Sequence, residues 1–143
     1  MNSNSDNQIE VLFEDNHLLV VNKPALLPTM GVKADDDSLY RRAATYLKTK
    51  YNKPGNVYVG IVSRLDAHTT GAIVLARTSK AASRLSDHIR RGTIDKRYLA
   101  LVPAGLLPIN ATLSDRLVKN ETLHCMQVVP ENAAPVANER MPC

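Results

Sequence analysis

An arginine and an aspartate, Arg64 and Asp66, stand two residues apart near the middle of this chain. They follow an apolar run, Val57–Val62, that predicts a strand. Residues i and i+2 of an extended segment point to the same side, so we expect both charged side chains on one face and Leu65 turned into the core. A guanidinium beside a carboxylate favours the ionised carboxylate, the form that acts as a nucleophile or a general base.

The loop after this pair is built from small residues. Thr69, Thr70 and Gly71 lead into a second apolar run, Ala72–Ala76. Glycine lets other groups approach the backbone closely, which suits a site. Taken alone, however, an aspartate at a strand end is a structural turn residue about nine times in ten. The neighbouring motifs must therefore indicate whether Asp66 is a structural turn residue or a catalytic residue.

Three stretches, in this order and spacing, resemble the RluA-type RNA pseudouridine synthases. They are Val11–Pro24, Ser63–Gly71 with Arg-Leu-Asp inside it, and Lys96–Val102. Two positions depart from the family pattern. Ser63 stands where the family more often has His, and Leu26 stands where Gly usually follows Lys-Pro-Ala.

The resemblance implies an isomerase that converts uridine in RNA to pseudouridine without a cofactor or a metal. Asp66 would be the catalytic carboxylate, either attacking the ribose C1′ or removing the C2′ proton, and the sequence leaves both routes open. Arg64 would hold Asp66 and fill the space of a flipped-out nucleotide, and Tyr98 would lie against the flipped uracil. The implied partner is ribosomal or transfer RNA. Lys23-Pro24 is interpreted as a strand terminator rather than an RNA contact.

The family also has a C-terminal Gly-Arg-x-His-Gln-Ile-Arg-like segment, which this sequence lacks. We therefore expect a pseudouridine synthase-like α+β fold that is incomplete at its C-terminus. Its sheet is expected to be mixed and mostly antiparallel, with helices packed against it. Three alternatives stay open: an active enzyme, a non-catalytic RNA-binding remnant, and a truncated inactive fragment.

Length and composition bear on the domain organisation, the compartment and the partner. The 143 residues fit one catalytic domain, expected over residues 9–129, with disordered ends at 1–8 and 130–143. No apolar run is long enough to span a bilayer, and the two cysteines form no disulfide framework, so a cytoplasmic protein is predicted. The net charge of +4 permits an anionic partner. The oligomeric state is not predicted.

Further elements are predicted from hydrophobic spacing. Ile9–Val21 is predicted to form two strands around a turn at Glu14–His17, and Tyr98–Val102 a strand. A helix is predicted with Leu39, Ala43, Leu47 and Tyr51 on one stripe and Asp37 as its N-cap. A second helix is predicted from Thr78 or Ser79 to about Arg91, and one or two strands between Ala111 and Val129.

The segment from Arg77 to Arg97 carries an excess of five basic residues over acidic ones. A solvated helix face and a phosphate-contacting surface explain this excess equally well. The candidate phosphate contacts are Arg77, Lys80, Arg84, Arg90, Arg91 and Lys96.

Overall fold

A computed structural model describes residues 8–31, 36–105, 110, 112–120, 122–123 and 125–130. The chain divides into two compact units, Met1–Ile94 and Asp95–Cys143, each of which is described by itself. A single catalytic domain over residues 9–129 therefore stays a prediction. The ends expected to be disordered lie outside the described residues, except for residues 8 and 130.

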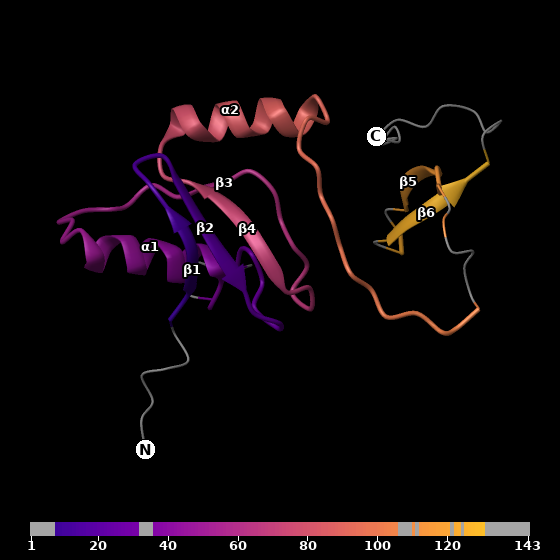
Figure 1. Cartoon of the computed structure of the whole chain (residues 1–143), viewed down its shortest axis with the longest axis horizontal. Coiled ribbons are helices and arrows are strands. Elements are labelled where there is room, and N and C mark those ends of the chain that lie inside the picture. The colour runs from indigo at the N-terminus through magenta and orange to yellow at the C-terminus, as the bar shows by residue number, and fades with distance from the viewer. Residues whose placement is uncertain are drawn as a thin grey trace, which may run out of the picture. The chain divides into compact units, whose positions relative to one another are not determined.

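The first unit contains a four-stranded antiparallel sheet in the order β1-β2-β4-β3 (Figure 1). The strands are β1 (Glu10–Glu14), β2 (Leu18–Lys23), β3 (Gly60–Ile61) and β4 (Gly71–Ala76). The predicted pair of strands at the N-terminus is confirmed, and Pro24 directly follows the end of β2. The predicted Val57–Val62 strand is too long, because only Gly60 and Ile61 pair with β4.

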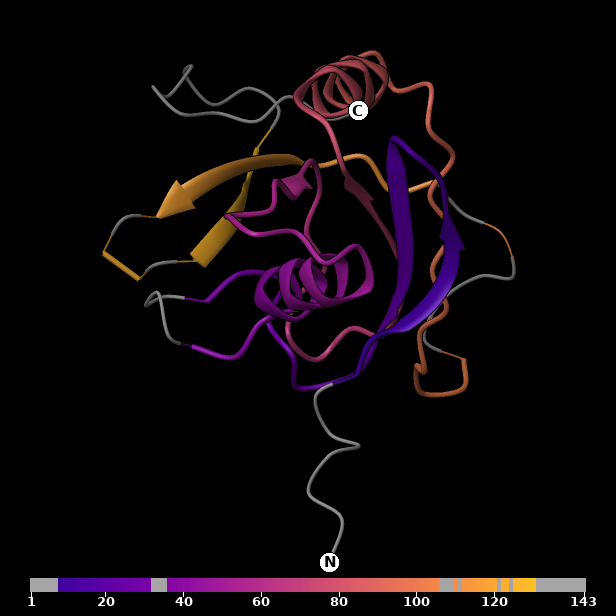
Figure 2. The same cartoon turned by 90° about the vertical axis from the view of Figure 1, so that its left-hand side faces the viewer.

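Helix α1 (Leu39–Lys50) packs on one face of this sheet (Figure 2). The predicted stripe is confirmed for three of its four residues: Leu39, Ala43 and Leu47 are buried in the core with alternate residues of β2 and β4. Tyr51 is not part of the buried stripe, because it is the exposed C-cap of α1. The N-cap prediction is wrong by one residue. The hydroxyl of Ser38, not the carboxylate of Asp37, accepts from the Arg41 N–H, because Asp37 pairs with Arg42 instead.

Helix α2 (Ser79–Arg90) follows β4 and packs against β3 and β4. Thr78, one of the two residues predicted to begin this helix, is its N-cap and accepts a hydrogen bond from the Ala81 N–H at 3.2 Å. The helix ends at Arg90 with Arg91 as its C-cap, and Gly92 follows with a φ of 66°, which suits a residue without a side chain. A Cβ at Gly60 would lie 3.0 Å from the Ala82 Cβ, so Gly60 lets α2 approach the sheet closely. No helix of the described part is long and apolar enough to cross a membrane.

The second unit contains a hairpin of β5 (Arg116–Asn120) and β6 (Cys125–Val129). These are the strands expected between Ala111 and Val129. The strand predicted over Tyr98–Val102 is wrong: these residues are extended without a ladder, and Leu99 and Leu101 are fully exposed. A strand needs a neighbour for its backbone hydrogen bonds, and the described residues supply none to this segment.

Candidate active site

Asp66 lies on an exposed turn between β3 and β4. Arg64 and Asp66 are exposed, whereas Leu65 between them is partly buried against the core, so the predicted alternation is confirmed. The Thr69 N–H donates to the backbone carbonyl of Asp66 at 3.0 Å and closes the turn. The carboxylate thus faces solvent on a defined piece of backbone.

The expected pairing of Arg64 with Asp66 is not present. No ion pair joins these two described residues, although they lie on the same side of the chain. Two solvated charges gain little from pairing, because water screens their attraction and both side chains would lose rotational freedom. The structure therefore gives no support to Arg64 as the group that holds Asp66.

Lys23 is the charged group that reaches this turn. Its side chain is fully buried at the end of β2. The ammonium donates to the carbonyls of Pro24 at 3.0 Å, Leu27 at 2.8 Å and Ala67 at 3.0 Å. Burial lowers the pKa of Lys23, and the negative charge of nearby Asp66 opposes this shift.

Thr29 holds the same turn from the other side. Its hydroxyl, buried in the protein, donates to the Leu65 carbonyl at 2.7 Å and accepts from the Leu65 N–H at 3.2 Å. The backbone of Thr29 is in turn attached to α1, because its carbonyl accepts from the Tyr40 N–H at 3.1 Å. Residues on both sides of Asp66 are thus fixed by buried side chains.

The sequence contains a signal for the burial of Lys23. Leu19, Val21 and Lys23 are alternate residues of β2, and all three are buried on the same face. The period of two therefore placed Lys23 among core residues. Its interpretation as a strand terminator was incomplete. For Thr29, which lies in a loop, no periodic signal was present.

Two unusual backbone conformations flank this site. Gly71, the first residue of β4, has a φ of 124°, which side chains rarely allow. Leu26 has a φ of 64° and is 73% exposed. Leu26 stands where the family usually has Gly, and it adopts this left-handed conformation at a cost of about 1–2 kcal/mol.

Tyr98 and Lys96 belong to the second unit, and both are exposed there. The role of Tyr98 against a uracil stays a prediction. Within the described ranges, no three His, Cys, Asp or Glu side chains gather where they could hold a metal ion.

Comparison with known proteins decides the family. A family model described as RNA pseudouridylate synthase matches residues 17–140, which is most of the chain. The chain belongs to the RNA pseudouridylate synthase family. The family resemblance inferred from the three motifs is therefore confirmed, and the match extends beyond Val102, where the resemblance in the sequence faded.

The relatives of this pseudouridylate synthase chain include enzymes named for ribosomal RNA. It is 37% identical over 103 residues to ribosomal large subunit pseudouridine synthase D of Zymomonas mobilis, covering 71% of this chain and 32% of the relative. It is 34% identical over 98 residues to the protein of the same name from Pseudomonas aeruginosa, covering 68% and 30%. The chain thus spans about a third of the length of the curated relatives it matches.

A solved structure supports the fold. Human RNA pseudouridylate synthase domain containing 4 matches with a TM-score of 0.50 and 26% identity, over 59% of this chain and 30% of that one. The α+β class with a mostly antiparallel sheet and packed helices is therefore shown for this pseudouridylate synthase chain.

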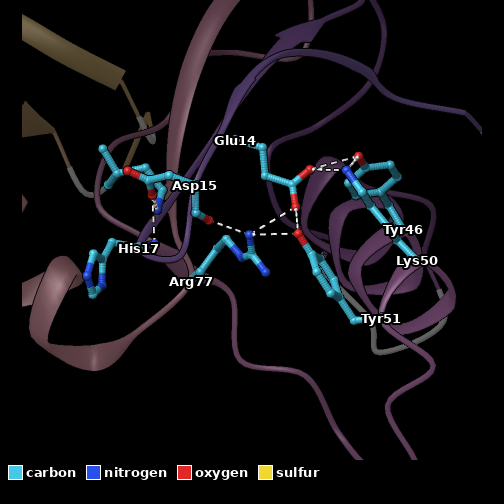
Figure 3. A network of polar contacts seen from close by, with 8 residues as sticks. Glu14, Asp15, His17, Tyr46, Lys50, Tyr51 and Arg77 are labelled. Atoms are coloured by element: carbon cyan, nitrogen blue, oxygen red, sulfur yellow. Dashed lines mark hydrogen bonds and ion pairs between the residues drawn. The ribbon is translucent and has the colours of Figure 1, made fainter.

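Arg77, a candidate phosphate contact, binds other side chains and backbone of the first unit (Figure 3). Its guanidinium pairs with Glu14 at 2.9 Å, donates to the carbonyl of Asp15 and the hydroxyl of Tyr51, and stacks 4.5 Å from the Tyr51 ring. The side chains of Arg77 and Glu14 are only 10% and 9% exposed. This guanidinium is therefore already engaged by protein groups.

The other basic candidates of the first unit are exposed on α2 or directly after it. Arg90 and Arg91 both pair with Asp87, the latter at 2.7 Å. Lys80 and Arg84, one helical turn apart, form no ion pair with any described residue. Their charges are the most available to an anionic ligand on this helix.

Proposed function

We propose that this chain isomerises uridine to pseudouridine in structured RNA, and that the carboxylate of Asp66 carries the chemistry. The observation that supports this most is a solvent-facing Asp66, within the Arg-Leu-Asp motif of the family, on a turn fixed from both sides by Lys23 and Thr29. Relatives are named ribosomal large subunit pseudouridine synthases, so large-subunit ribosomal RNA is the first substrate to test. Transfer RNA is the second, and the cytoplasm is the proposed compartment.

The proposed reaction breaks the bond between the ribose C1′ and the uracil N1 and joins C1′ to C5. The proton on C5 leaves, N1 regains a proton, and no group or electron is gained, so the reaction itself requires no cofactor. Asp66 contributes either by attacking C1′ or by removing the C2′ proton. Both roles need an accessible, ionised carboxylate at a fixed position.

Arg64 and Tyr98 are proposed to contact the substrate. The exposed guanidinium of Arg64 is not paired with Asp66 and can therefore face the space that a flipped-out nucleotide leaves. Tyr98 would present an aromatic face to the uracil. Since Tyr98 is exposed, its ring is available for such a contact.

The proposed RNA contacts of the first unit are Lys80 and Arg84 of α2. Lys96 is a separate proposed contact in the second unit. Replacing both Lys80 and Arg84 with Gln should flatten the dependence of log affinity on log salt by about 0.7–0.9 per lost contact. The matched control replaces Arg90 and Arg91 with Gln and should flatten it less, because Asp87 already shares their charge. An unchanged slope in the first variant would show that these residues only keep the helix solvated.

Asp66→Ala tests the catalytic proposal. The wild-type chain and the variant are each incubated, in molar excess over the RNA, with an unmodified large-subunit ribosomal RNA transcript. Pseudouridine is then measured by mass spectrometry of the digested RNA. We expect product with the wild type and none with the variant, while RNA affinity stays within a few-fold, because the carboxylate makes no favourable contact with phosphate.

A wild-type chain that binds the transcript but forms no pseudouridine in ribosomal or transfer RNA would overturn catalysis by these 143 residues. It would favour the alternative function, a non-catalytic RNA-binding remnant. The exposed, unpaired Tyr98–Val102 segment is the observation in favour of that alternative.

A further inference from the structure

Two buried polar side chains outside the Arg-Leu-Asp motif both reach the turn that carries Asp66. Lys23, the last residue of β2, is at 0% exposure, and Thr29, in the loop between β2 and α1, is at 3%. Burying an ammonium costs several kcal/mol unless its donors are satisfied. The partners of these two side chains therefore show why the fold tolerates them.

The three donors of Lys23 have three acceptors. Two of them, the carbonyls of Pro24 and Leu27, shape the loop of Lys23 itself. The third is the carbonyl of Ala67, which lies 44 residues further along the chain and directly after Asp66. An ammonium has three donors, so this bond to Ala67 completes the set.

Thr29 makes a matching contact on the other side of Asp66. One hydroxyl both donates to the carbonyl and accepts from the N–H of Leu65, the residue directly before Asp66. The carbonyls of Pro28 and Thr29 accept from the N–H groups of Leu39 and Tyr40 at 2.9 and 3.1 Å, so this loop is anchored to the start of α1. The turn thereby gains a rigid support.

We propose that Lys23 and Thr29 are positioning residues that fix the backbone directly before and after Asp66, so that its carboxylate is held where a ribose can meet it. This proposal rests on the proposed function for its purpose, but the positioning itself is measurable without turnover. A misplacement of about 1 Å at a reacting group can cost a hundredfold in rate, so a two-sided backbone clamp has a clear catalytic value. Neither residue touches the substrate in this proposal.

Amide hydrogen exchange measured by NMR on the full chain tests the clamp. The probes are the Leu65 N–H, which donates to Thr29, and the Thr69 N–H, which donates to Asp66. In Thr29→Val the hydroxyl is lost at nearly constant volume, and both probes should exchange about tenfold faster, the factor expected for one lost hydrogen bond. Thr29→Ser keeps the hydroxyl and should restore the wild-type rates.

Lys23→Met removes the charge and the bond to Ala67 and should accelerate the Thr69 probe in the same way. Glu14→Gln, at the opposite end of the sheet, is the matched control for general destabilisation. This control variant should leave the ratio of two exchange rates unchanged from the wild type. The first is the rate of the Leu65 and Thr69 amides, and the second is the rate of the amides in β2 and β4. If Lys23→Met does not fold, the Thr29 pair of variants decides the question alone.

Unchanged exchange in Thr29→Val, or equal acceleration of all amides of the first unit, would overturn the clamp. Where the wild type converts uridine, Thr29→Val should lower kcat about tenfold or more with KM unchanged, and Thr29→Ser should recover it. A wild type without turnover would count against the proposed function alone, because the exchange rates would still show whether the backbone is held.

Discussion

The two ends of the four-stranded sheet place a carboxylate in opposite environments. At the end where Lys23 of β2 lies opposite Gly71 of β4, the carboxylate of Asp66 is exposed and unpaired. At the other end, where Leu18 lies opposite Ala76, the carboxylate of Glu14 is enclosed. Its partners are Arg77, Lys50 and the hydroxyls of Tyr46 and Tyr51 (Figure 3).

The difference separates an acid that the fold encloses, Glu14, from one that faces solvent, Asp66. Burial on its own would raise the pKa of Glu14, but hydrogen bonds from Lys50, Tyr51 and Tyr46 outweigh it and lower the pKa to about 2. The same bond with Glu14 raises the pKa of Lys50. A carboxylate whose oxygens are all engaged cannot approach a ribose. Asp66, by contrast, has only its backbone fixed.

Backbone strain does not follow the same division, because Asn52, next to Tyr51 of the Glu14 network, has a φ of 46°. The left-handed Leu26 and Gly71 both lie at the Asp66 end, next to the contacts of Lys23. Strain of this kind persists where the surrounding structure fixes it, and it is common at functional sites. The Glu14 end consists of a hairpin with an ordinary Asp15 turn, whose carboxylate accepts from the His17 and Leu18 N–H groups at 2.7 and 2.6 Å.

The largest effect on stability is expected from Arg77→Met. The substitution leaves the buried Glu14 carboxylate without its guanidinium and removes the contact with the Tyr51 ring, which should lower the free energy of unfolding by about 3 kcal/mol. Both described helices lie in the first unit, so urea unfolding followed by the helical circular dichroism signal measures it. Lys80→Met, on the exposed face of α2, is the control and should change stability by less than about 0.5 kcal/mol. Equal stability of the two variants would contradict the structural role of Arg77.

The second largest effect on stability is expected from low pH, which should remove the stabilising charge of Glu14. The folded pKa of about 2 lies below the ordinary value of 4.5, so the ionised Glu14 stabilises the fold above pH 4.5, and this contribution disappears as the pH falls toward 2. Glu14→Gln should therefore be less stable than the wild type by about 2–3 kcal/mol at pH 7, and the two should converge near pH 2. A difference that stays constant from pH 7 to pH 2 would show that the charge of Glu14 is not involved.

A smaller, opposite effect is expected at the Asp66 end. Leu26→Gly should raise the free energy of unfolding by about 0.5–1 kcal/mol, because glycine relieves the left-handed strain and the exposed leucine side chain loses little packing. The matched control is Leu99→Gly, at a leucine that is fully exposed and has no positive φ. If Leu26→Gly destabilises the protein, the loop is not strained at this residue.

The sequence predicted the elements whose signals are local. The spacing of Leu39, Ala43 and Leu47 predicted α1, and Thr78 predicted the start of α2, because core contacts and caps depend on nearby residues. The Tyr98–Val102 strand was wrong because a strand also requires a partner, which no local pattern supplies. The motif selected Asp66, which lies on an exposed turn, and its catalytic role stays a prediction.

The support of Asp66 was not predicted, and the reason is physical. Thr29 meets Leu65 across 36 residues, and Lys23 meets Ala67 across 44. Contacts of this kind arise from tertiary packing between a loop and a turn, which neither composition nor periodicity describes. Arg64 was predicted as the partner of Asp66 because residues i and i+2 of an extended segment share a side and because the family resemblance implies it. The buried lysine instead comes from β2.

One matched pair of substitutions tests the central claim, that the two acids at opposite ends have separate roles. Asp66→Asn and Glu14→Gln both replace a carboxylate with an amide of nearly the same shape. Pseudouridine formation and urea unfolding are measured for both at pH 7. We predict that Asp66→Asn abolishes product formation and changes stability by less than about 0.5 kcal/mol, whereas Glu14→Gln lowers stability by about 2–3 kcal/mol and retains product formation. Turnover near the wild-type rate in Asp66→Asn, beside a wild type that converts uridine, would contradict the account.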